Sequence, residues 1–349
     1  MNEGWRGALC GAGLGGRGKR LVGVEENAHG RDDGYIPLMV RFKAWWEGIE
    51  PEDVLRAGEG AQPGMAQPTE VNPNPNAIEV DIKDESGPLK SWSEARLNFC
   101  RRLWGEEFEV VRPGGTEFSV RLVRPMALTS ENSLLDLSAG LGGGTRQIHK
   151  ELGVWVTGLE RNPELAKQAA VLSKMKGLDR KVPITAYEPA KISLKPTSFD
   201  GALIRETLYT IPDRETFLRK VAASIRPFGH LVLTDLMLVN EEARTDRRVN
   251  AWLKRDVADA SPDIVGTYTP LLEELGFDVR VEEDESDAYH AYVLQGWATF
   301  VEGLSREDLD RELVSLMMIE ADFWVNLMRA IQAGKVRLCR IHGIKKPPA

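Results

Sequence analysis

A glycine-rich turn between two short apolar runs carries the residue types best suited to binding chemistry in this sequence. Residues 134–137 form the first run, Gly140 and Gly142 lie in the turn, and residues 154–160 form a second run that ends in Glu160. Such runs, separated by a stretch with helical spacing, are typical of neighbouring parallel strands, whose carboxyl ends face a ligand-binding crevice. Glycines let the backbone approach a ligand closely, and a carboxylate at the end of the second strand can accept hydrogen bonds from the hydroxyls of a ribose. The pattern therefore predicts a site for a nucleoside-containing cofactor.

The residues around this turn favour one class of cofactor over the dinucleotides. A dinucleotide-binding turn would carry a third glycine where Thr145 stands, and Asp136 at the end of the first run would repel a pyrophosphate. A cofactor with an amino-acid end, and hence an ammonium group, would tolerate that acid. The string DLSAGLGGGTR resembles motif I of the class I, Rossmann-like S-adenosylmethionine-dependent methyltransferases, with Ser138 in place of the first glycine of D-x-G-x-G-x-G.

The resemblance extends from about residue 92 to residue 346. Five further stretches match, in order, the third, fourth and fifth strands, the late helix with the sixth strand, and the closing strand of that family: VPITAYEP, SFDGALIRETLY, IRPFGHLVLTDLM, LLEELGFDVRVEED and GKVRLCRIHGIKK. The resemblance implies an α/β, Rossmann-like class I methyltransferase fold, in which a mostly parallel seven-stranded sheet has helices on both faces. Residues 287–304 and 306–334 are additional to the minimal fold of that family, and we expect them to form a helical cover over the substrate.

The elements that position this site suggest a chain in three parts. Residues 1–90 are rich in Gly, Pro, Asn and acids, and we expect a low-complexity, flexible extension there. Residues 91–240 are expected to form the cofactor-binding core with its first helix, and residues 241–349 the rest of the fold with the helical cover. A further hypothesis places the natural start at Met39 or Met65, which sequencing the natural N-terminus would test.

The overall composition is that of a cytoplasmic enzyme acting on small molecules. The net charge is −8 and no basic stripe is present, which argues against a nucleic-acid partner. Three widely separated cysteines support neither a disulfide framework nor a zinc site, and no His/Asp/Glu spacing predicts a catalytic metal. No apolar run has the length of a membrane span, and the first residues lack the apolar core of a secretory signal.

The resemblance implies a set of S-adenosyl-L-methionine-binding residues. Those expected around its methionine portion are Asp136, Ser138, Gly140 and Gly142. Glu160 is expected on the ribose and Glu188 near the adenine amino group, with Arg161 and Pro189 flanking the adenine. Arg205, at the arginine position of the family's fourth strand, is expected to meet the carboxylate of the cofactor.

The layout resembles that of small-molecule N-methyltransferases of the phosphoethanolamine and sarcosine–dimethylglycine types. The histidine that phosphoethanolamine enzymes carry after the fourth strand is replaced by Thr210, and their tyrosine after the fifth strand is replaced by Leu236, which disfavours a phosphobase substrate. The candidate catalytic residues are Glu206 and Tyr209 after the fourth strand and His290 in the expected cover, with a packing role as the alternative for the first two. A further candidate, Asp235 at the end of the fifth strand, is as well explained as a cap.

Aromatic side chains suggest how an acceptor would be enclosed. Trp92 and Tyr268 are candidate pocket walls that could hold a methylated ammonium by cation–π attraction, whereas Trp104 and Trp324 are expected in the core. The sequence therefore predicts methyl transfer from S-adenosylmethionine to nitrogen or oxygen of a small molecule. The alternative is a cofactor-binding protein of the same fold that transfers no methyl group and acts through partners. Methylation of a protein or nucleic acid is a weaker hypothesis, because the sequence has no basic groove.

Overall fold

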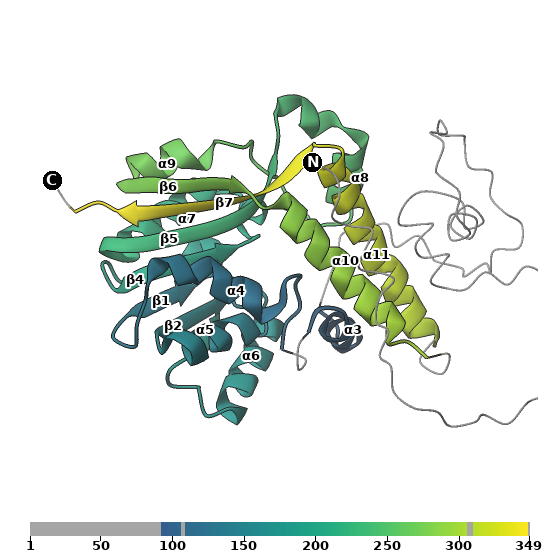
Figure 1. The fold of residues 1–349 in the computed structure, drawn as a ribbon, viewed down its shortest axis with the longest axis horizontal. Coiled ribbons are helices and arrows are strands. Elements are labelled where there is room, and N and C mark those ends of the chain that lie inside the picture. Colours follow the sequence, from purple (N-terminus) through teal and green to yellow (C-terminus); the bar gives the residue numbers. More distant parts are fainter. Residues whose placement is uncertain (1–91, 106–108, 306–309, 348–349) are drawn as a thin grey trace, which may run out of the picture. The chain divides into compact units, whose positions relative to one another are not determined.

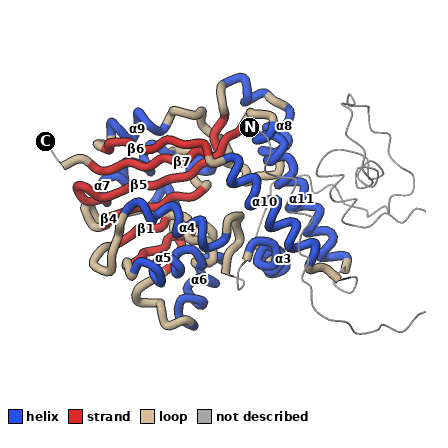
Figure 2. The backbone as a smooth tube through the Cα atoms, in the orientation of Figure 1, coloured by secondary structure: helices blue, strands red, loops and turns tan. Residues whose placement is uncertain are grey.

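The computed structural model describes residues 92–105, 109–305 and 310–347, and the expected extension at residues 1–90 lies outside them. A seven-stranded sheet with the order β3-β2-β1-β4-β5-β7-β6 forms its centre (Figures 1 and 2). The strands in chain order are β1 (Ser133–Asp136), β2 (Trp155–Glu160), β3 (Ile184–Ala186), β4 (Phe199–Arg205), β5 (Ile225–Leu238), β6 (Phe277–Asp284) and β7 (Val336–Lys345). The first five are parallel to one another, and β7 runs antiparallel between β5 and β6. The predicted fold class is confirmed.

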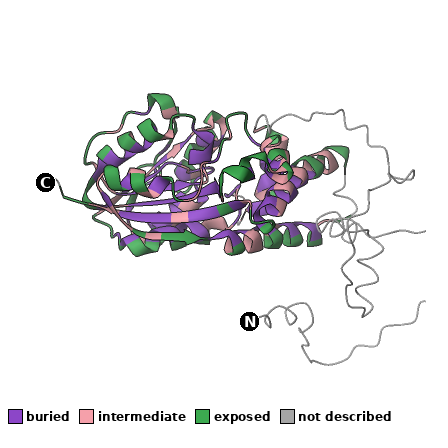
Figure 3. Cartoon of the chain, turned by 90° about the horizontal axis from the view of Figure 1, so that it is seen from above, coloured by how far each residue is buried: buried purple, intermediate pink, exposed green. Residues whose placement is uncertain are grey.

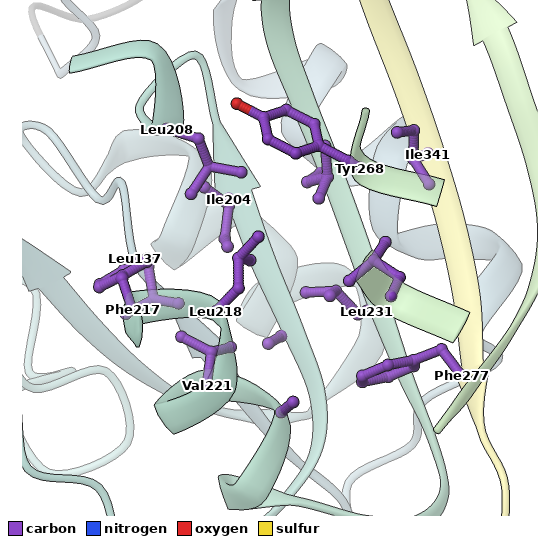
Figure 4. Close-up of a cluster of buried hydrophobic side chains, with 14 of the residues drawn as sticks. Leu137, Ile204, Leu208, Phe217, Leu218, Val221, Leu231, Tyr268, Phe277 and Ile341 are labelled. Carbon is purple, nitrogen blue, oxygen red and sulfur yellow. The ribbon is translucent and has the colours of Figure 1, made fainter. Parts of the chain in front are cut away.

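Helices cover both faces of this sheet. The helices around the sheet are α4 (Gly115–Val123), which precedes β1, and the connecting helices α5 (Gly143–Leu152), α6 (Pro163–Met175), α7 (Arg214–Ser224) and α9 (Tyr268–Glu274). On one face, side chains of α7 and α9 interdigitate with those of the central strands in a fully buried cluster that includes Leu218, Leu231 and Phe277 (Figure 4). Helices α4 and α5 lie over the opposite face (Figure 1). Buried residues therefore follow the strands and the inner sides of the helices, as Figure 3 shows.

A second group of helices lies beside the sheet and corresponds to the expected helical cover. It comprises α3 (Glu94–Trp104), α8 (Arg247–Leu253), α10 (Ser286–Glu302) and α11 (Arg311–Gln332). Aromatic rings join these helices, since Phe99 of α3 lies 5.1 Å from Phe300 of α10, and Trp104 of α3 lies 4.9 Å from Trp324 of α11, between ring centroids. Short 3₁₀ turns at Arg124–Met126, Pro189–Lys191, Leu208–Thr210 and Glu241–Thr245 complete the described elements.

Local sequence signals fix the ends of the helices next to the site. Gly142 precedes α5 with a φ of +81°, and a Cβ there would come within 2.3 Å of Ile184, so the turn requires glycine. Asn162 caps α6 by accepting hydrogen bonds from the backbone N–H groups of Glu164 and Leu165, and Pro163 occupies the first helical position. These two helix starts place the glycine turn and the end of β2 at the same edge of the sheet.

Two histidines face each other across β5 and β7 and make stability depend on pH. His230 Nδ1 and His342 Nε2 lie 3.0 Å apart. Burial lowers the pKa of both rings, and for His342 burial together with the neighbouring His230 and Arg340 lowers it to about 4. Below the ordinary histidine pKa the unfolded chain binds protons that the folded pair does not, so stability is complete above that pKa and falls as the pH is lowered from about 6.5 to about 4.

We expect the free energy of unfolding, measured with urea, to fall by about 2–3 kcal/mol between pH 7 and pH 4 because of this pair. Each unit of pKa shift corresponds to about 1.4 kcal/mol. His342→Gln should reduce that loss while changing stability little at pH 7. An equal loss in the variant and the unmodified protein would contradict this origin of the acid sensitivity.

Candidate active site

A cavity of about 760 Å³ opens at the carboxyl edge of the parallel strands. Its walls come from the ends of β2 and β3, the turn after β4, the segment before α4, and helices α3, α10 and α11. This is the edge at which open α/β sheets bind their ligands. The residues predicted to bind the nucleoside and the helical cover therefore border one continuous space.

Glu160 lies at the end of the cavity where the nucleoside of the cofactor is expected. Its side chain is buried, with 4% of the residue exposed, and its two oxygens accept hydrogen bonds from the backbone N–H groups of Gly140 (2.8 Å) and Asn162 (2.9 Å). These bonds hold the carboxylate at the cavity wall while its remaining lone pairs stay available to ribose hydroxyls. A Cβ at Gly140 would meet only Val111, at 3.7 Å, so the turn leaves room above it. These residues fit the nucleoside portion of S-adenosylmethionine.

Asp136 and Ser138 organise the glycine turn through a hydrogen-bond network. Asp136 Oδ2 accepts a bond from the Thr145 hydroxyl (2.7 Å), and Oδ1 accepts bonds from the N–H and hydroxyl groups of Ser138. Ser138 Oγ in turn accepts a bond from the backbone N–H of Arg205 (2.9 Å), which ties the turn to the end of β4. Burial raises the pKa of Asp136. The departure from the family motif at Ser138 is thus accommodated by new hydrogen bonds.

Ser138→Ala is expected to destabilise the protein by about 1–2 kcal/mol, because the buried N–H of Arg205 loses its acceptor. Urea unfolding measures the effect, and Ser130→Ala in the exposed loop before β1 is the control, with an expected change under about 0.5 kcal/mol. Equal changes in the free energy of unfolding for the two variants would show that the hydrogen-bond network contributes nothing to stability.

Asp136, Ser138 and Gly140 also line a small space of about 30 Å³ where the methionine portion is expected. Arg205 borders it and donates hydrogen bonds to the Ser119 hydroxyl (2.7 Å) and to the carbonyl oxygen of Pro113 (3.3 Å). Its guanidinium also lies 4.6 Å from the ring centroid of Phe118. The main contacts of Arg205 therefore hold the segment before α4 over the sheet, and a bond to the carboxylate of the cofactor stays a prediction.

Arg112 borders both spaces and was missed in the sequence analysis. It donates a hydrogen bond from Nη1 to the carbonyl oxygen of Arg205 (2.8 Å). Burial lowers the pKa of Arg112, but the neighbouring carboxylates of Glu160 and Glu206 more than offset this effect and raise it. The guanidinium thus remains charged between the two ends of the cavity. The adjoining Pro-Gly-Gly turn was the only sequence signal for this position.

The predicted adenine-flanking residues Arg161, Glu188 and Pro189 all border the cavity. Arg161 donates a hydrogen bond to Thr210, which occupies the position of the histidine in phosphoethanolamine enzymes. Glu188 lies at the rim, where its side chain is 59% exposed and forms an ion pair with Lys191 (2.7 Å). Tyr187, which was not predicted, also borders the cavity and donates a hydrogen bond to the carbonyl oxygen of Leu137 (3.0 Å).

Two of the three predicted catalytic residues border the cavity. Glu206 and Tyr209 do so, and Tyr209 donates a hydrogen bond to Asp256 Oδ2 (3.0 Å). Asp256 also borders the cavity, and burial raises its pKa to about 6, although hydrogen bonds from Val257 and Tyr209 oppose the rise. Sequence analysis missed Asp256, because no motif distinguishes it from the neighbouring acids. Its position makes it a candidate proton acceptor.

The other candidates lie elsewhere. His290 is absent from the cavity wall and contacts Gln332 at the end of α11 (2.9 Å), so its position does not support a catalytic role. Asp235 is fully buried beneath the site, where it accepts a hydrogen bond from Tyr268 (2.9 Å). Tyr268 belongs to the core cluster between the sheet and α9, and the expectation that it forms a pocket wall is wrong (Figure 4).

Aromatic rings make up much of the wall formed by the helical cover. Trp92 borders the cavity as predicted, and Trp104 and Trp324, which were expected in the core, are buried and also border it. Tyr289 and Phe323 complete the group, with their ring centroids 6.3 Å and 5.0 Å from that of Trp324. The cavity thus has a polar nucleoside end and an aromatic end.

Comparison with protein families identifies the type of domain that contains this cavity. Residues 135–233 match the family model described as a methyltransferase domain. Residues 135–233 therefore carry a methyltransferase domain. Within the residues that the structure describes, there is no group of three or more metal-ligating side chains that could hold an ion, and none of their helices is both long and apolar enough to span a membrane.

Known methyltransferases resemble this chain over most of the described region. The 27-O-demethylrifamycin SV methyltransferase of Amycolatopsis mediterranei is 27% identical over 62% of this chain and 79% of its own length. Phosphoethanolamine N-methyltransferase 1 of Arabidopsis thaliana is 24% identical over 60% of this chain, which spans only 42% of that relative. Phosphoethanolamine N-methyltransferase 2 of Haemonchus contortus in complex with S-adenosyl-L-methionine has the same fold, with a TM-score of 0.62 and 16% identity over 74% of this chain and 59% of its own. The predicted resemblance to this type of methyltransferase domain is confirmed.

Proposed function

We propose that this protein transfers a methyl group from S-adenosylmethionine to nitrogen or oxygen of a small-molecule acceptor. The observation that carries the proposal is the continuous cavity, whose wall includes both Glu160 at the end of β2 and residues of α10 and α11. The Amycolatopsis relative is an O-methyltransferase and the Arabidopsis relative an N-methyltransferase, so both acceptor atoms occur among similar proteins. The net charge of −8 supports a small molecule over a nucleic acid.

The mechanism assigns each group of residues one task. When bound, the cofactor supplies an electrophilic methyl group on a sulfonium. Glu160 would hold the ribose, Arg161, Glu188 and Pro189 would lie around the adenine, and Asp136 and Ser138 keep the glycine turn in place. The helical cover would exclude water and position the acceptor for in-line attack. Glu206, or Tyr209 with Asp256, would take the proton of the acceptor.

The alternative is a protein that binds the cofactor, transfers no methyl group and acts through partners, and no feature of the site favours it. Calorimetry with S-adenosylmethionine and S-adenosylhomocysteine tests the shared step. Incubation with methyl-labelled cofactor and a small-molecule metabolite extract then separates the two. Labelled product formed only by the intact protein would exclude the alternative, whereas binding without transfer to any extract would contradict the proposed function.

A further inference from the structure

One carboxylate oxygen in the acceptor half of the cavity lacks a hydrogen-bond partner. Glu206 follows β4, its side chain is only 6% exposed, and its Oε1 accepts a hydrogen bond from the Thr234 hydroxyl (2.7 Å). Within the described part of the chain its Oε2 accepts no hydrogen bond, and the nearest cation is Nη2 of Arg205 at 3.7 Å. Because a buried carboxylate oxygen is costly to leave unpaired, this oxygen is suited to a ligand that donates a hydrogen bond.

The backbone holds Glu206 in an unusual conformation. Its φ is +41°, in the left-handed region that non-glycine residues rarely adopt, and its N–H donates a hydrogen bond to the carbonyl oxygen of Thr234 (2.7 Å). Such strain persists only where the surrounding structure enforces it, and it concentrates at functional sites. The combination of strain, burial and an unpaired oxygen points to a ligand contact.

The charges around the cavity favour a cationic ligand. Five carboxylates border it, namely Glu160, Glu188, Glu206, Asp256 and Glu320, whereas its cationic side chains are Arg96, Arg112 and Arg161. Arg96 is already paired with Glu320 at 2.5 Å, and Arg112 is shared between Glu160 and Glu206. Even with Arg205, whose Nη2 lies 3.7 Å from Glu206 Oε2, counted as a fourth cation, the carboxylates around the cavity outnumber the guanidinium groups by one.

Aromatic rings face the same part of the cavity. Tyr289 lies close enough to Glu206 that, beyond the effect of burial, the carboxylate raises the pKa of the tyrosine. Its ring is 6.3 Å from that of Trp324, which itself packs edge-on against Trp104 at 4.9 Å. Aromatic faces attract cations, most strongly where water is excluded, and they also pack against the apolar parts of a ligand.

We infer that the methyl acceptor is an amine on an apolar, ring-containing frame, and that its nitrogen donates a hydrogen bond to Glu206 Oε2 while the frame packs against Tyr289 and Trp324. This inference rests on the proposed function and narrows its acceptor from nitrogen or oxygen to an amine nitrogen. The amine arrives as an ammonium ion, and its proton passes to the Glu206 carboxylate. Where the bound ligands and the helical cover exclude water, this transfer turns an ion pair into two neutral groups, which low polarity favours.

The lone pair of the amine then forms the bond to the methyl carbon. The carbon–sulfur bond breaks at the same time, and its electron pair stays on sulfur, which becomes a neutral thioether. The product nitrogen carries the positive charge that the sulfonium carried, and the proton on Glu206 returns to water when the product leaves. Charge and atoms therefore balance without a further reactant.

The test compares phenethylamine with 2-phenylethanol, which differ in the NH₂ and OH groups, by calorimetry on protein saturated with S-adenosylhomocysteine. We expect the amine to bind at least about tenfold more tightly than the alcohol, since a charge-assisted hydrogen bond and a cation–π contact are added. Glu206→Gln should weaken amine binding about tenfold and leave binding of the alcohol and of S-adenosylhomocysteine unchanged. Glu215→Gln, which changes an exposed acid outside the cavity, is the matched control and should leave the preference intact.

Equal affinity of the unmodified protein for the two probes would overturn the inference, and this comparison does not depend on whether any variant folds. A loss of S-adenosylhomocysteine affinity in folded Glu206→Gln, with the amine preference unchanged, would assign Glu206 to the cofactor and would also overturn it. Failure of the proposed function can be told apart from failure of this inference. It would appear as absent cofactor binding in calorimetry, or as absent label transfer in the incubation with methyl-labelled cofactor.

Discussion

Glu160→Ala is expected to weaken the binding of S-adenosylmethionine by about 100-fold or more, because the substitution would remove the proposed charge-assisted hydrogen bonds to the ribose, worth about 1.5–3 kcal/mol each. The effect has a second source. Glu160 also accepts the backbone N–H of Gly140, so its removal releases the glycine turn from the end of β2. Isothermal titration calorimetry with S-adenosylhomocysteine measures the loss without requiring a methyl acceptor.

The control for this prediction is Glu188→Gln, an acid at the rim of the same cavity. Glu188 is largely exposed and already paired with Lys191, so its loss should change the affinity by less than about tenfold. Similar losses for the two variants, or no loss for Glu160→Ala, would mean that the nucleoside does not bind at the end of β2.

Arg146→Ala is expected to destabilise the protein by about 3–5 kcal/mol, the range found when one partner of a buried ion pair is removed. Arg146 is 1% exposed and donates hydrogen bonds from Nε and Nη2 to Glu109, from Nη2 to the carbonyl oxygen of Leu141, and from Nη1 to Ser173. It thereby ties the segment before α4 to the glycine turn and to α6. Its loss would leave Glu109 with Lys176 as its remaining ion-pair partner and the carbonyl of Leu141 without this donor.

The matched control is Arg124→Ala, which breaks the exposed pair with Glu151. The Arg124 side chain is 68% exposed, and the expected change is below about 1 kcal/mol. Thermal and urea unfolding compare both variants with the unmodified protein. A cost for Arg146→Ala as small as that of Arg124→Ala would contradict the structural role of the buried pair.

The sheet could be predicted from the sequence because each central strand has its own run of apolar residues. The apolar stretches at 134–135 in β1, 202–204 in β4 and 231–233 in β5 are fully buried, although Phe228 at the start of β5 is exposed. Glu160 could be assigned because it ends β2, directly beside the glycine turn. Such features depend on residues that are neighbours in the chain, and these are what periodicity and turn chemistry report.

The acceptor end of the site was less predictable, because tertiary contacts decide it. Asp256 becomes a candidate proton acceptor because Tyr209, which is far away in the sequence, donates a hydrogen bond to it. Tyr268 and His290 carry suitable side chains, but helix packing turns the first into the core and the second toward Gln332. Helical spacing alone did not determine which faces of α9 and α10 would border the cavity.

The position of β7 has a consequence for how the chain folds during synthesis. Val336–Lys345 lies between β5 and β6, so both of these strands keep an unpaired edge until residues 336–345 are available. Pairings over such sequence separations form slowly, and open edges are sites of aggregation while they last. Residue 345 must therefore leave the ribosome before the sheet can close, and until then the β5 edge stays open to other strands.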